Sequence, residues 1–252
     1  MAELTNNLRK MVASLGNARN RREESCFVAE GTKCVCDTWH AFKCRYLFAT
    51  ASWIEQYGRV LPGVEPIVVK RVDMERMSQL STPAQVLAVY EMPQMIFDER
   101  NLSSNLVIAL DRVQDPGNLG TIIRIADWFG ITDIVCSPET VDVYNPKVVQ
   151  ATMGAISRVK VHYLDLAELI KRNPDVLVYG TFLDGRNIYE TSLTPHGIVV
   201  MGNEGQGISD EIGHLIKRRL LIPSYPQERP TSESLNVGMA TAITIAEFRR
   251  RI

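Results

Sequence analysis

The pattern of apolar and polar residues is most regular from Asn105 onward, where short apolar runs alternate with segments that carry apolar residues at helical spacing. The apolar runs predict strands at Leu106–Leu110, Ile131–Cys136, Arg158–His162, Val176–Gly180, Ile198–Met201 and Leu220–Ile222. The other segments predict helices at Leu119–Phe129, Pro146–Met153, Leu166–Lys171, Ser209–Lys217 and Ser234–Arg250. Strands that alternate with helices in this way predict an α/β fold with a mainly parallel sheet and helices on both faces.

Residues 1–92 predict a separate and smaller α/β unit. Its helices are expected at Asn6–Leu15 and Gly31–Ala41, and its strands at Cys26–Ala29, Tyr46–Ala49, Ile67–Val69 and Val86–Tyr90. Met92-Pro93 and the polar stretch Asp98–Ser104 then mark a boundary. We therefore expect a first domain at residues 1–94, a linker at 95–104 and a second domain at 105–252.

Local signals place several element ends in the second domain. Asn145 directly before Pro146 is typical of a capped helix start. The acidic residues of Ser209–Glu211 favour another helix start, and Gly130 suits a helix C-terminus.

Composition and charge narrow the classes of function. The chain has 252 residues, of which 45% are hydrophobic, and a formal net charge of -1 from 28 basic and 29 acidic residues. This balance argues against a polycation that coats nucleic acid and leaves only local basic patches. Arg19, Arg21 and Arg22 form one such patch, which suits either RNA contact or a solvated loop end.

The apolar stretches are too short to cross a membrane. Leu106–Leu110 and Ile198–Met201 are far shorter than the roughly 20 residues that a spanning helix needs, so we expect no membrane association. The N-terminal stretch lacks the apolar core of a secretory signal. We therefore expect a cytoplasmic protein without disulfides.

The cysteines suit reduced thiols better than a metal site. There are five of them, an odd number that does not make a disulfide framework. Cys34, Cys36, His40 and Cys44 suggest zinc, but they lack the two ligand pairs that structural zinc sites normally show. We predict no bound metal.

Ligands of parallel sheets collect beyond the carboxyl ends of the strands, so the loops that follow the strands are the candidate sites. The first such loop, Asp111–Gly120, follows strand Leu106–Leu110 and enters a helix that carries Arg124. Its glycines permit tight turns, and the helix N-terminus offers unpaired N–H groups to an anion such as an RNA phosphate. Arg124 suits a structural salt bridge equally well.

The second loop, Gly202–Ser209, contains three glycines and follows the next-to-last predicted strand. A dinucleotide fingerprint needs G-x-G-x-x-G, and the sixth position counted from Gly205 is Asp210, so this signature is missing. The glycines let the backbone approach a flat ligand closely. Glu204 is placed to pair with Arg124 or with an incoming group.

The third loop runs from Pro223 to Asn236, between the last predicted strand and the last helix. That helix is apolar around much of its circumference, which indicates burial in a domain core or at a dimer interface. Ser234 and Asn236 lie where helix N-caps usually lie, so capping is the simplest role for each of them in isolation.

Together and in this order, the three loops resemble the motifs of the SpoU (TrmH) family of RNA 2′-O-ribose methyltransferases, in the SPOUT superfamily. The resemblance rests on D-P-G-N-L-G-T-I-I-R at Asp115–Arg124, V-M-G-N-E-G-Q-G-I-S at Val200–Ser209, I-P-S at Ile222–Ser224 and S-L-N-V at Ser234–Val237. Three motifs in order are far more specific than a single glycine-rich loop.

The resemblance implies a deep C-terminal trefoil knot and a homodimer formed through the C-terminal domain. It also implies that S-adenosyl-L-methionine is held among the knotted loops, largely by backbone groups. The positions that match this cofactor site are Thr181, Met201, Gly202, Ile222, Leu235 and Asn236.

The resemblance further assigns the chemistry to Arg124, with polar surroundings at Asn118, Glu204, Ser234 and Asn236. A ribose hydroxyl that attacks a sulfonium methyl group must lose its proton, so the site has to stabilise negative charge on oxygen and align the two reactants. A guanidinium stays protonated in proteins. We therefore expect Arg124 to anchor a phosphate and stabilise the oxyanion, with the proton acceptor unassigned.

Residues 19–90 resemble the substrate-binding domain that precedes the knot in many ribosomal-RNA members of the family, a small α/β sandwich similar to certain RNA-binding ribosomal proteins. The matching segments are R-N-R-R-E-E-S-C-F-V-A-E-G at Arg19–Gly31 and S-T-P-A-Q-V-L-A-V at Ser81–Val89. This resemblance favours Arg19, Arg21 and Arg22 as RNA contacts, and ribosomal RNA over transfer RNA as substrate. In one departure from the family, the stretch Tyr225–Glu233 is longer and more charged than the usual link, so access to the site is expected to differ.

Other functions fit parts of the pattern. One is a transfer-RNA 2′-O-methyltransferase, and another is an RNA-binding protein that kept the knot but lost turnover, against which Arg124, Glu204 and Asn236 argue. A third is a nucleotide-dependent oxidoreductase on a doubly wound sheet, against which the missing dinucleotide fingerprint argues. The sequence does not identify the modified nucleotide.

Overall fold

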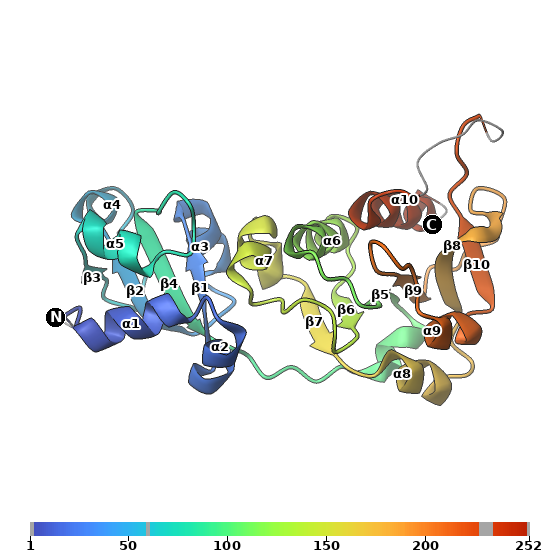
Figure 1. The fold of residues 1–252 in the computed structure, drawn as a ribbon, viewed down its shortest axis with the longest axis horizontal. Helices are drawn as coiled ribbons and strands as arrows, with labels where there is room; N and C mark the ends of the chain where they lie inside the picture. Colours follow the sequence, from blue (N-terminus) through green and yellow to red (C-terminus); the bar gives the residue numbers. More distant parts are fainter. Residues whose placement is uncertain (1–2, 59–60, 227–233, 251–252) are drawn as a thin grey trace. The chain divides into compact units, whose positions relative to one another are not determined.

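The computed structural model describes residues 3–58, 61–226 and 234–250, and the chain divides into two compact units. The first unit comprises Met1–Gln94 and Asp142–Arg158, and the second comprises Met95–Val141 and Val159–Ile252. Each unit is built around a sheet of its own (Figure 1).

The first unit has a four-stranded mixed sheet in the order β1-β4-β2-β3, in which β4 runs antiparallel to β1 and β2, and β3 runs parallel to β2. The strands are β1 (Cys26–Glu30), β2 (Cys44–Ala49), β3 (Ile67–Val68) and β4 (Val86–Glu91). The helices are α1 (Asn6–Ser14), α2 (Ala18–Glu24), α3 (Thr32–Thr38), α4 (Ala51–Tyr57), α5 (Arg71–Met77), α7 (Pro146–Ala151) and the 3-10 helix η2 (Ala155–Ser157).

One face of this sheet packs against α1 and α5. Alternate residues of each strand point to the same face, so Leu87 and Val89 of β4 both enter this core. The buried cluster comprises Val12, Leu15, Cys26, Val28, Phe48, Ile67, Val69, Met74, Met77, Leu87 and Val89.

The second unit has a six-stranded sheet in the order β10-β8-β9-β5-β6-β7, in which every paired strand is parallel to its neighbour. The strands are β5 (Leu106–Leu110), β6 (Asp133–Cys136), β7 (Lys160–Tyr163), β8 (Val178–Asn187), β9 (Gly197–Met201) and β10 (Arg218–Leu221). The helices are η1 (Glu99–Ser103), α6 (Pro116–Trp128), α8 (Leu166–Arg172), α9 (Asp210–Leu215) and α10 (Val237–Arg250). Helices α6 and α10 cover one face, and α8 and α9 cover the other (Figure 1).

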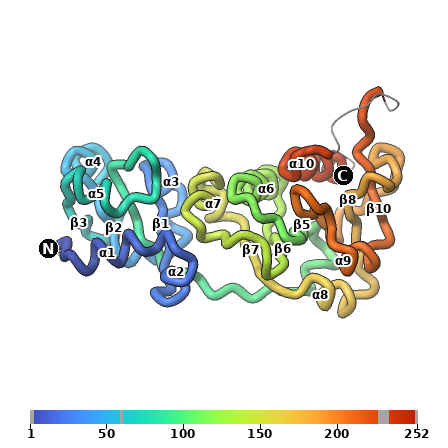
Figure 2. The backbone as a smooth tube through the Cα atoms, in the orientation of Figure 1, coloured from blue at the N-terminus to red at the C-terminus, as the bar shows by residue number. Residues whose placement is uncertain are grey.

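Strand β5 lies inside the sheet, and the chain builds outward from it in two directions. It first adds β6 and β7 on one side, then crosses through α8 to β8 on the other side and returns to insert β9 beside β5 (Figure 2). The order of strands therefore reverses between β5 and β9. In open α/β sheets, ligands bind at such a reversal, outside the carboxyl ends of the two strands.

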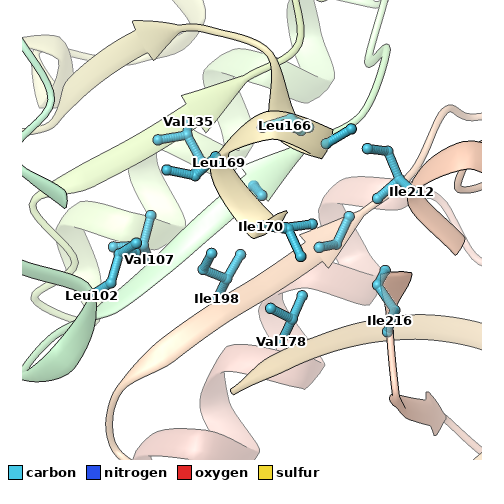
Figure 3. Close-up of a cluster of buried hydrophobic side chains, with 13 residues drawn as sticks. Leu102, Val107, Val135, Leu166, Leu169, Ile170, Val178, Ile198, Ile212 and Ile216 are labelled. Carbon is cyan, nitrogen blue, oxygen red and sulfur yellow. The ribbon is translucent and has the colours of Figure 1, made fainter. Parts of the chain in front are cut away.

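The main core of the second unit lies between the sheet and helices α8 and α9 (Figure 3). Val107 and Ala109 of β5 belong to this core. The remaining residues of β5 point to the opposite face of the sheet and are also buried, because α6 covers that face. The cluster comprises Leu102, Val107, Ala109, Val135, Leu166, Ala167, Leu169, Ile170, Val178, Ile198, Val200, Ile212 and Ile216.

The predicted α/β architecture is confirmed, with strands at every position where an apolar run indicated one. The caps at Asn145 and Gly130 are also confirmed, since Asn145 accepts from the Lys147 amide and Gly130 has a φ of 66° at the end of α6. Helices α2, α4 and α5 were not predicted, because each is a short helix of seven residues with little apolar periodicity.

The domain boundaries differ from the predicted ones in two places. The expected linker at 95–104 contains η1, whose Leu102 is buried in the core of the second unit, so this stretch is part of that unit. Residues 142–158 were expected in the second domain but group with the first unit, where α7 packs on β1. Packing between distant segments decides both boundaries.

Two expectations about the fold are untested. The trefoil knot stays a prediction, and most of the charged stretch at 225–233 lies outside the described residues. No helix in the described part of the chain is long and apolar enough to cross a membrane.

Arg21 is buried, so its predicted contact with RNA is wrong. Its side chain is 1% exposed. The Nη1 atom donates to the carbonyls of Leu15 and Gly16 at 2.9 Å, and Nε donates to Oδ2 of Asp142 at 3.0 Å. Arg21 therefore closes the C-terminal end of α1 and holds segment 142–158 in the first unit.

We expect Asp142→Ala to destabilise the first unit by about 3 kcal/mol, because it leaves a buried guanidinium without its carboxylate. Urea unfolding of the full chain measures this change. Arg19→Ala is the matched control, since Arg19 is 84% exposed and its ion pair with Glu23 is worth less than about 1 kcal/mol. Equal stability of the two variants would contradict the structural role of the Arg21–Asp142 pair.

Candidate active site

The loops that follow β5 and β9 meet at the reversal in strand order. Because β5 and β9 are adjacent and parallel, their carboxyl ends lie at the same edge of the sheet. The first loop contains Asp111–Asp115, and the second contains Gly202–Ser209. This is the edge at which the sequence placed its candidate motifs.

The first loop is shaped by its own side chains and by the second loop. Asp115 caps α6, since its Oδ1 accepts from the Asn118 amide at 2.8 Å, and Pro116 follows as the first helical residue. The buried Asp111 accepts through Oδ2 from the Ser209 amide at 2.6 Å. Arg112 adopts a left-handed φ of 57°, a conformation that costs energy outside glycine.

The second loop forms a tight turn around Asn203. The backbones of Asn203 and Gly207 exchange two hydrogen bonds, at 2.9 and 3.0 Å. The Asn203 side chain accepts from the amides of Gly205 and Gln206 and donates to the Arg112 carbonyl at 2.7 Å. Gly202 is required here, because a Cβ at this position would lie 2.2 Å from the backbone of Gly207.

Glu204 joins the second loop to the first. Its carboxylate accepts from the Asn118 side chain at 2.9 Å and from the amides of Asp115 and Gln114 at 3.1 and 3.3 Å. Burial by itself would raise the pKa of Glu204, but these hydrogen bonds outweigh it and hold the pKa below its ordinary value. Glu204 is therefore ionised at neutral pH.

Asn118 and Asn236 extend the connection to the third loop. The Asn236 Nδ2 atom donates to Oδ1 of Asn118 at 2.9 Å, while its Oδ1 accepts from the Gly238 amide at the start of α10. Asn236 thus caps the last helix, as its position suggested, and also takes part in the polar network. We call Glu204, Asn118 and Asn236 the amide–carboxylate chain.

A cavity of about 440 Å³ opens beside this chain, within the second unit. The middle of β8, the loop after β9, the end of β10 with the loop that follows it, and the start of α10 form its walls. Its lining is mainly apolar and rich in glycine, with one charged side chain, Glu204, among the lining residues that the structure describes. The lining comprises Thr181, Phe182, Leu183, Met201, Gly202, Asn203, Glu204, Gly205, Gln206, Gly207, Ile208, Leu220, Leu221, Ile222, Ser234, Leu235, Val237 and Ala240.

The structure brings most of the expected site residues together. Of the six residues implied for cofactor binding, five line the cavity, namely Thr181, Met201, Gly202, Ile222 and Leu235, and the sixth, Asn236, belongs to the amide–carboxylate chain. Ser234 lines the cavity as well.

Arg124 is exposed on α6 and has no hydrogen-bond or ion-pair partner within the described ranges. The pairing with Glu204 that the sequence allowed is absent from these residues, since Glu204 binds Asn118 and two backbone amides instead. The structural salt bridge considered for Arg124 is likewise not seen among them. Its guanidinium faces solvent.

Several residues that shape the site carried no prediction from the sequence. Asp111 and Asn203 fasten the first two loops together, and Phe182 and Leu183 supply cavity wall. Asp111 lies in the first candidate loop and Asn203 in the second motif, so their positions within two residues of a buried strand were a usable signal. Phe182 and Leu183 carried none, because an apolar residue near a strand end is most often core.

Comparisons with known proteins agree with this geometry. The profile of the SpoU rRNA Methylase family matches residues 105–246, and that of the MRM3-like substrate binding domain matches residues 6–88. The 23S rRNA (guanosine(2553)-2′-O)-methyltransferase RlmP of Bacillus subtilis is 31% identical over 190 residues, which are 74% of this chain and 73% of that protein.

Solved structures match over the whole chain. A candidate RNA methyltransferase of the TrmH family from Porphyromonas gingivalis is 38% identical, with a TM-score of 0.87 and complete coverage of both chains. An rRNA methyltransferase from Sinorhizobium meliloti with bound AdoMet is 28% identical, with a TM-score of 0.85 over 100% of this chain and 98% of that one.

The lowered pKa of Glu204 predicts a pH-dependent effect of Glu204→Gln. The stability that Glu204 contributes is fully present above its ordinary pKa of 4.5 and is lost as pH falls through the lower pKa of the folded protein. We expect Glu204→Gln to cost about 1 kcal/mol at neutral pH, because a charged acceptor is lost, and progressively less as pH falls below 4.5.

Urea unfolding of both proteins across this pH range measures the difference. Glu139→Gln is the control, since Glu139 is exposed on a turn of the same unit. A difference between wild type and Glu204→Gln that does not change with pH would contradict the ionised network.

Proposed function

The chain belongs to the SpoU rRNA methylase family, and from this premise we propose that it transfers a methyl group from S-adenosylmethionine to a ribose 2′-hydroxyl of ribosomal RNA. The observation that carries the proposal is the amide–carboxylate chain, which joins all the motif loops beside one cavity. An oxidoreductase is not supported, because the glycine loop turns on Asn203 and lacks the dinucleotide pattern.

The residues around the cavity fit S-adenosylmethionine. A volume of about 440 Å³ is in the usual range for a small-molecule site. Leu183 and Leu235 line it yet are 74% and 49% exposed, so they offer apolar surface that a nucleoside would cover. Gly207 adds room, since a Cβ there would meet nothing within 4 Å.

Charge also favours this cofactor. When bound, S-adenosylmethionine supplies an electrophilic methyl group on a sulfonium cation. The ionised Glu204 in the cavity wall favours a cation over a neutral ligand. We propose that Thr181, Met201, Gly202, Ile222 and Leu235 hold the cofactor by backbone and apolar contacts, and that Asn236 fixes the loop from which Leu235 comes.

Arg124 is proposed as the catalytic residue. Its guanidinium is uncommitted among the described residues, so it can bind an RNA phosphate and stabilise the negative charge that develops on the ribose oxygen. It does not accept the proton, because it stays protonated. Asn118 and Glu204 act as positioning residues, since their polar atoms already hold the loops together.

The first unit is proposed to bind the RNA. It matches a substrate-binding domain, and the relatives are named for action on 23S rRNA, which favours ribosomal over transfer RNA. Arg19 and Arg22 are exposed on α2 and stay candidates for phosphate contact, unlike the buried Arg21. A cytoplasmic location stays a prediction.

We expect Arg124→Ala to lower methyl transfer by about 100- to 1000-fold, the usual effect of removing one oxyanion donor. Binding of S-adenosylmethionine, measured by calorimetry, should be unchanged, because Arg124 does not line the cavity. Lys217→Ala removes an exposed cation of the same unit and is the control.

Radiolabelled methyl transfer to ribosomal RNA measures turnover, and mapping of 2′-O-methyl groups in cells with and without the gene identifies the nucleotide. Near-normal turnover in Arg124→Ala would refute the assignment of Arg124. Binding of cofactor without any methyl transfer by the wild-type protein would favour the non-catalytic RNA-binding alternative. Loss of a methyl group from transfer RNA alone would overturn the choice of ribosomal RNA.

We also propose that the second unit forms a homodimer through α6 and α10. These helices lie together, since Nε of Arg249 donates to the Phe129 carbonyl. Met239 of α10 is 61% exposed and Trp128 of α6 is 85% exposed. Partly exposed apolar residues continue from Met239 along one face of α10 at helical spacing, namely Ala242, Ile243 and Ala246.

We expect Met239→Glu to yield monomers, because a carboxylate in an apolar, self-complementary interface would be desolvated twice. Light scattering after size-exclusion chromatography measures the mass. Glu211→Lys on α9 is the control and should leave the dimer intact. A wild-type protein that is monomeric at micromolar concentration would disprove the dimer.

A further inference from the structure

The pairing of β8 with β10 is interrupted beside the cavity. Arg219 pairs with Gly180, but the next residue, Leu220, pairs with Arg186. The segment between them, Thr181–Gly185, therefore bulges out of the ladder between β8 and β10. We call this segment the β8 excursion.

The β8 excursion supplies a wall of the cavity. Thr181, Phe182 and Leu183 all line it. Because the excursion lacks register with β10, something other than that ladder must hold these side chains in place.

Phe182 lies beside two glycines, Gly180 of β8 and Gly213 of α9. A Cβ on Gly180 would lie 2.7 Å from the Phe182 ring, and one on Gly213 of α9 would lie 3.7 Å from it. The absence of a side chain at Gly180 gives the ring edge its space beside β8, and Gly213 of α9 lies beside the ring as well. The Phe182 ring is therefore packed against neighbouring elements, whereas the side chain of Leu183 is 74% exposed.

Arg219 closes the arrangement from the other side. Its guanidinium carbon lies 3.5 Å from the centroid of the Phe182 ring, close enough for a cation–π contact. Its Nε and Nη2 atoms donate to Oδ1 of Asp184 at 3.2 and 2.6 Å. Arg219 of β10 therefore contacts two residues of the β8 excursion, Phe182 and Asp184, at the point where the strand pairing is interrupted.

We propose that Arg219 is a positioning residue for the cofactor cavity, acting through Phe182 and Asp184 to hold the β8 excursion in its binding shape. This inference rests on the proposed function, because it takes S-adenosylmethionine as the ligand. Arg219 is itself outside the cavity lining, and its charge is matched by Asp184. Arg219 therefore affects ligand binding only by holding the cavity wall, and it does not contact the ligand itself.

We call the contacts of Arg219 with Phe182 and Asp184 the clamp. These contacts need an arginine. A planar guanidinium stacks on a ring and donates two hydrogen bonds at once, whereas a lysine ammonium is a point charge on a flexible stem. Arg219→Lys should therefore behave more like Arg219→Ala than like wild type. Asp184→Ala should give a smaller loss, because the stack on Phe182 remains.

The test compares Arg219→Ala with Arg218→Ala, which removes the neighbouring exposed arginine of β10. Calorimetric titration with S-adenosylmethionine should show about five- to tenfold weaker binding for Arg219→Ala and no change for Arg218→Ala. The KM for S-adenosylmethionine should rise by the same factor. The kcat at saturating cofactor and the KM for RNA should stay at wild-type values.

A double-mutant cycle tests whether Arg219 affects cofactor binding through Asp184. If Arg219 acts through Asp184, then Asp184→Ala weakens binding in the wild-type background and has no further effect in the Arg219→Ala background. Additive effects would overturn the clamp, as would wild-type affinity in Arg219→Ala. Should Arg219→Ala prove misfolded by circular dichroism, Asp184→Ala carries the test, and wild-type affinity there overturns the clamp.

The wild-type titration separates the two proposals. If the wild-type protein binds S-adenosylmethionine and Arg219→Ala binds it equally well, the role of Arg219 is refuted and the proposed methyltransferase activity is not affected. Failure of the wild-type protein to bind S-adenosylmethionine defeats both.

Discussion

The hydrogen bonds among Glu204, Asn118 and Asn236 are the interaction on which the rest of the site depends. They join residues 86 and 118 positions apart in the chain and so fix the loops after β5, β9 and β10 relative to one another. Each bond alone is worth only about 1 kcal/mol or somewhat more with a charged acceptor. Their value lies in geometry, because the loops after β9 and β10 line the cavity, and Asn236 also sets the start of α10. A change at any of the three residues therefore reaches the cavity wall.

This network also explains why some polar residues of the site hold the loops together while Arg124 is left to bind the substrate. The amide groups of Asn118 and Asn236 and the carboxylate of Glu204 are committed to one another and to backbone amides. Arg124, by contrast, stands exposed on the helix that Asp115 caps, with no partner among the described residues. Polar groups that hold shape and a cation that is free to bind are thus kept apart. Such preorganisation lets a charged transition state be stabilised without moving the protein.

The sequence predicted the inner strands of the second unit, β5, β6 and β9, well because they are covered on both faces. A strand such as β5 is then apolar at every position, and its limits at Leu106 and Leu110 are visible in the sequence. Helix α2 shows the opposite case, since its residues are nearly all polar and it is held by the Asn17 cap and by Arg21. No hydrophobic periodicity marks it. The glycine and asparagine motifs were likewise visible, because a tight turn and a helix cap each require particular residue types.

By itself, the sequence determined the alternation of strands and helices, the loops that carry the chemistry, and the family. Only the tertiary structure decided which charged and aromatic residues are free and which are committed. Arg19, Arg21 and Arg22 form one basic patch in the sequence, yet Arg21 is buried against an aspartate 121 residues away. Phe182 and Arg219 are unremarked in the sequence, yet Phe182 lines the cavity and Arg219 packs on its ring where β8 leaves its register with β10. The physical reason is that burial and charge pairing are set by partners distant in the chain, whereas periodicity and turn chemistry are local.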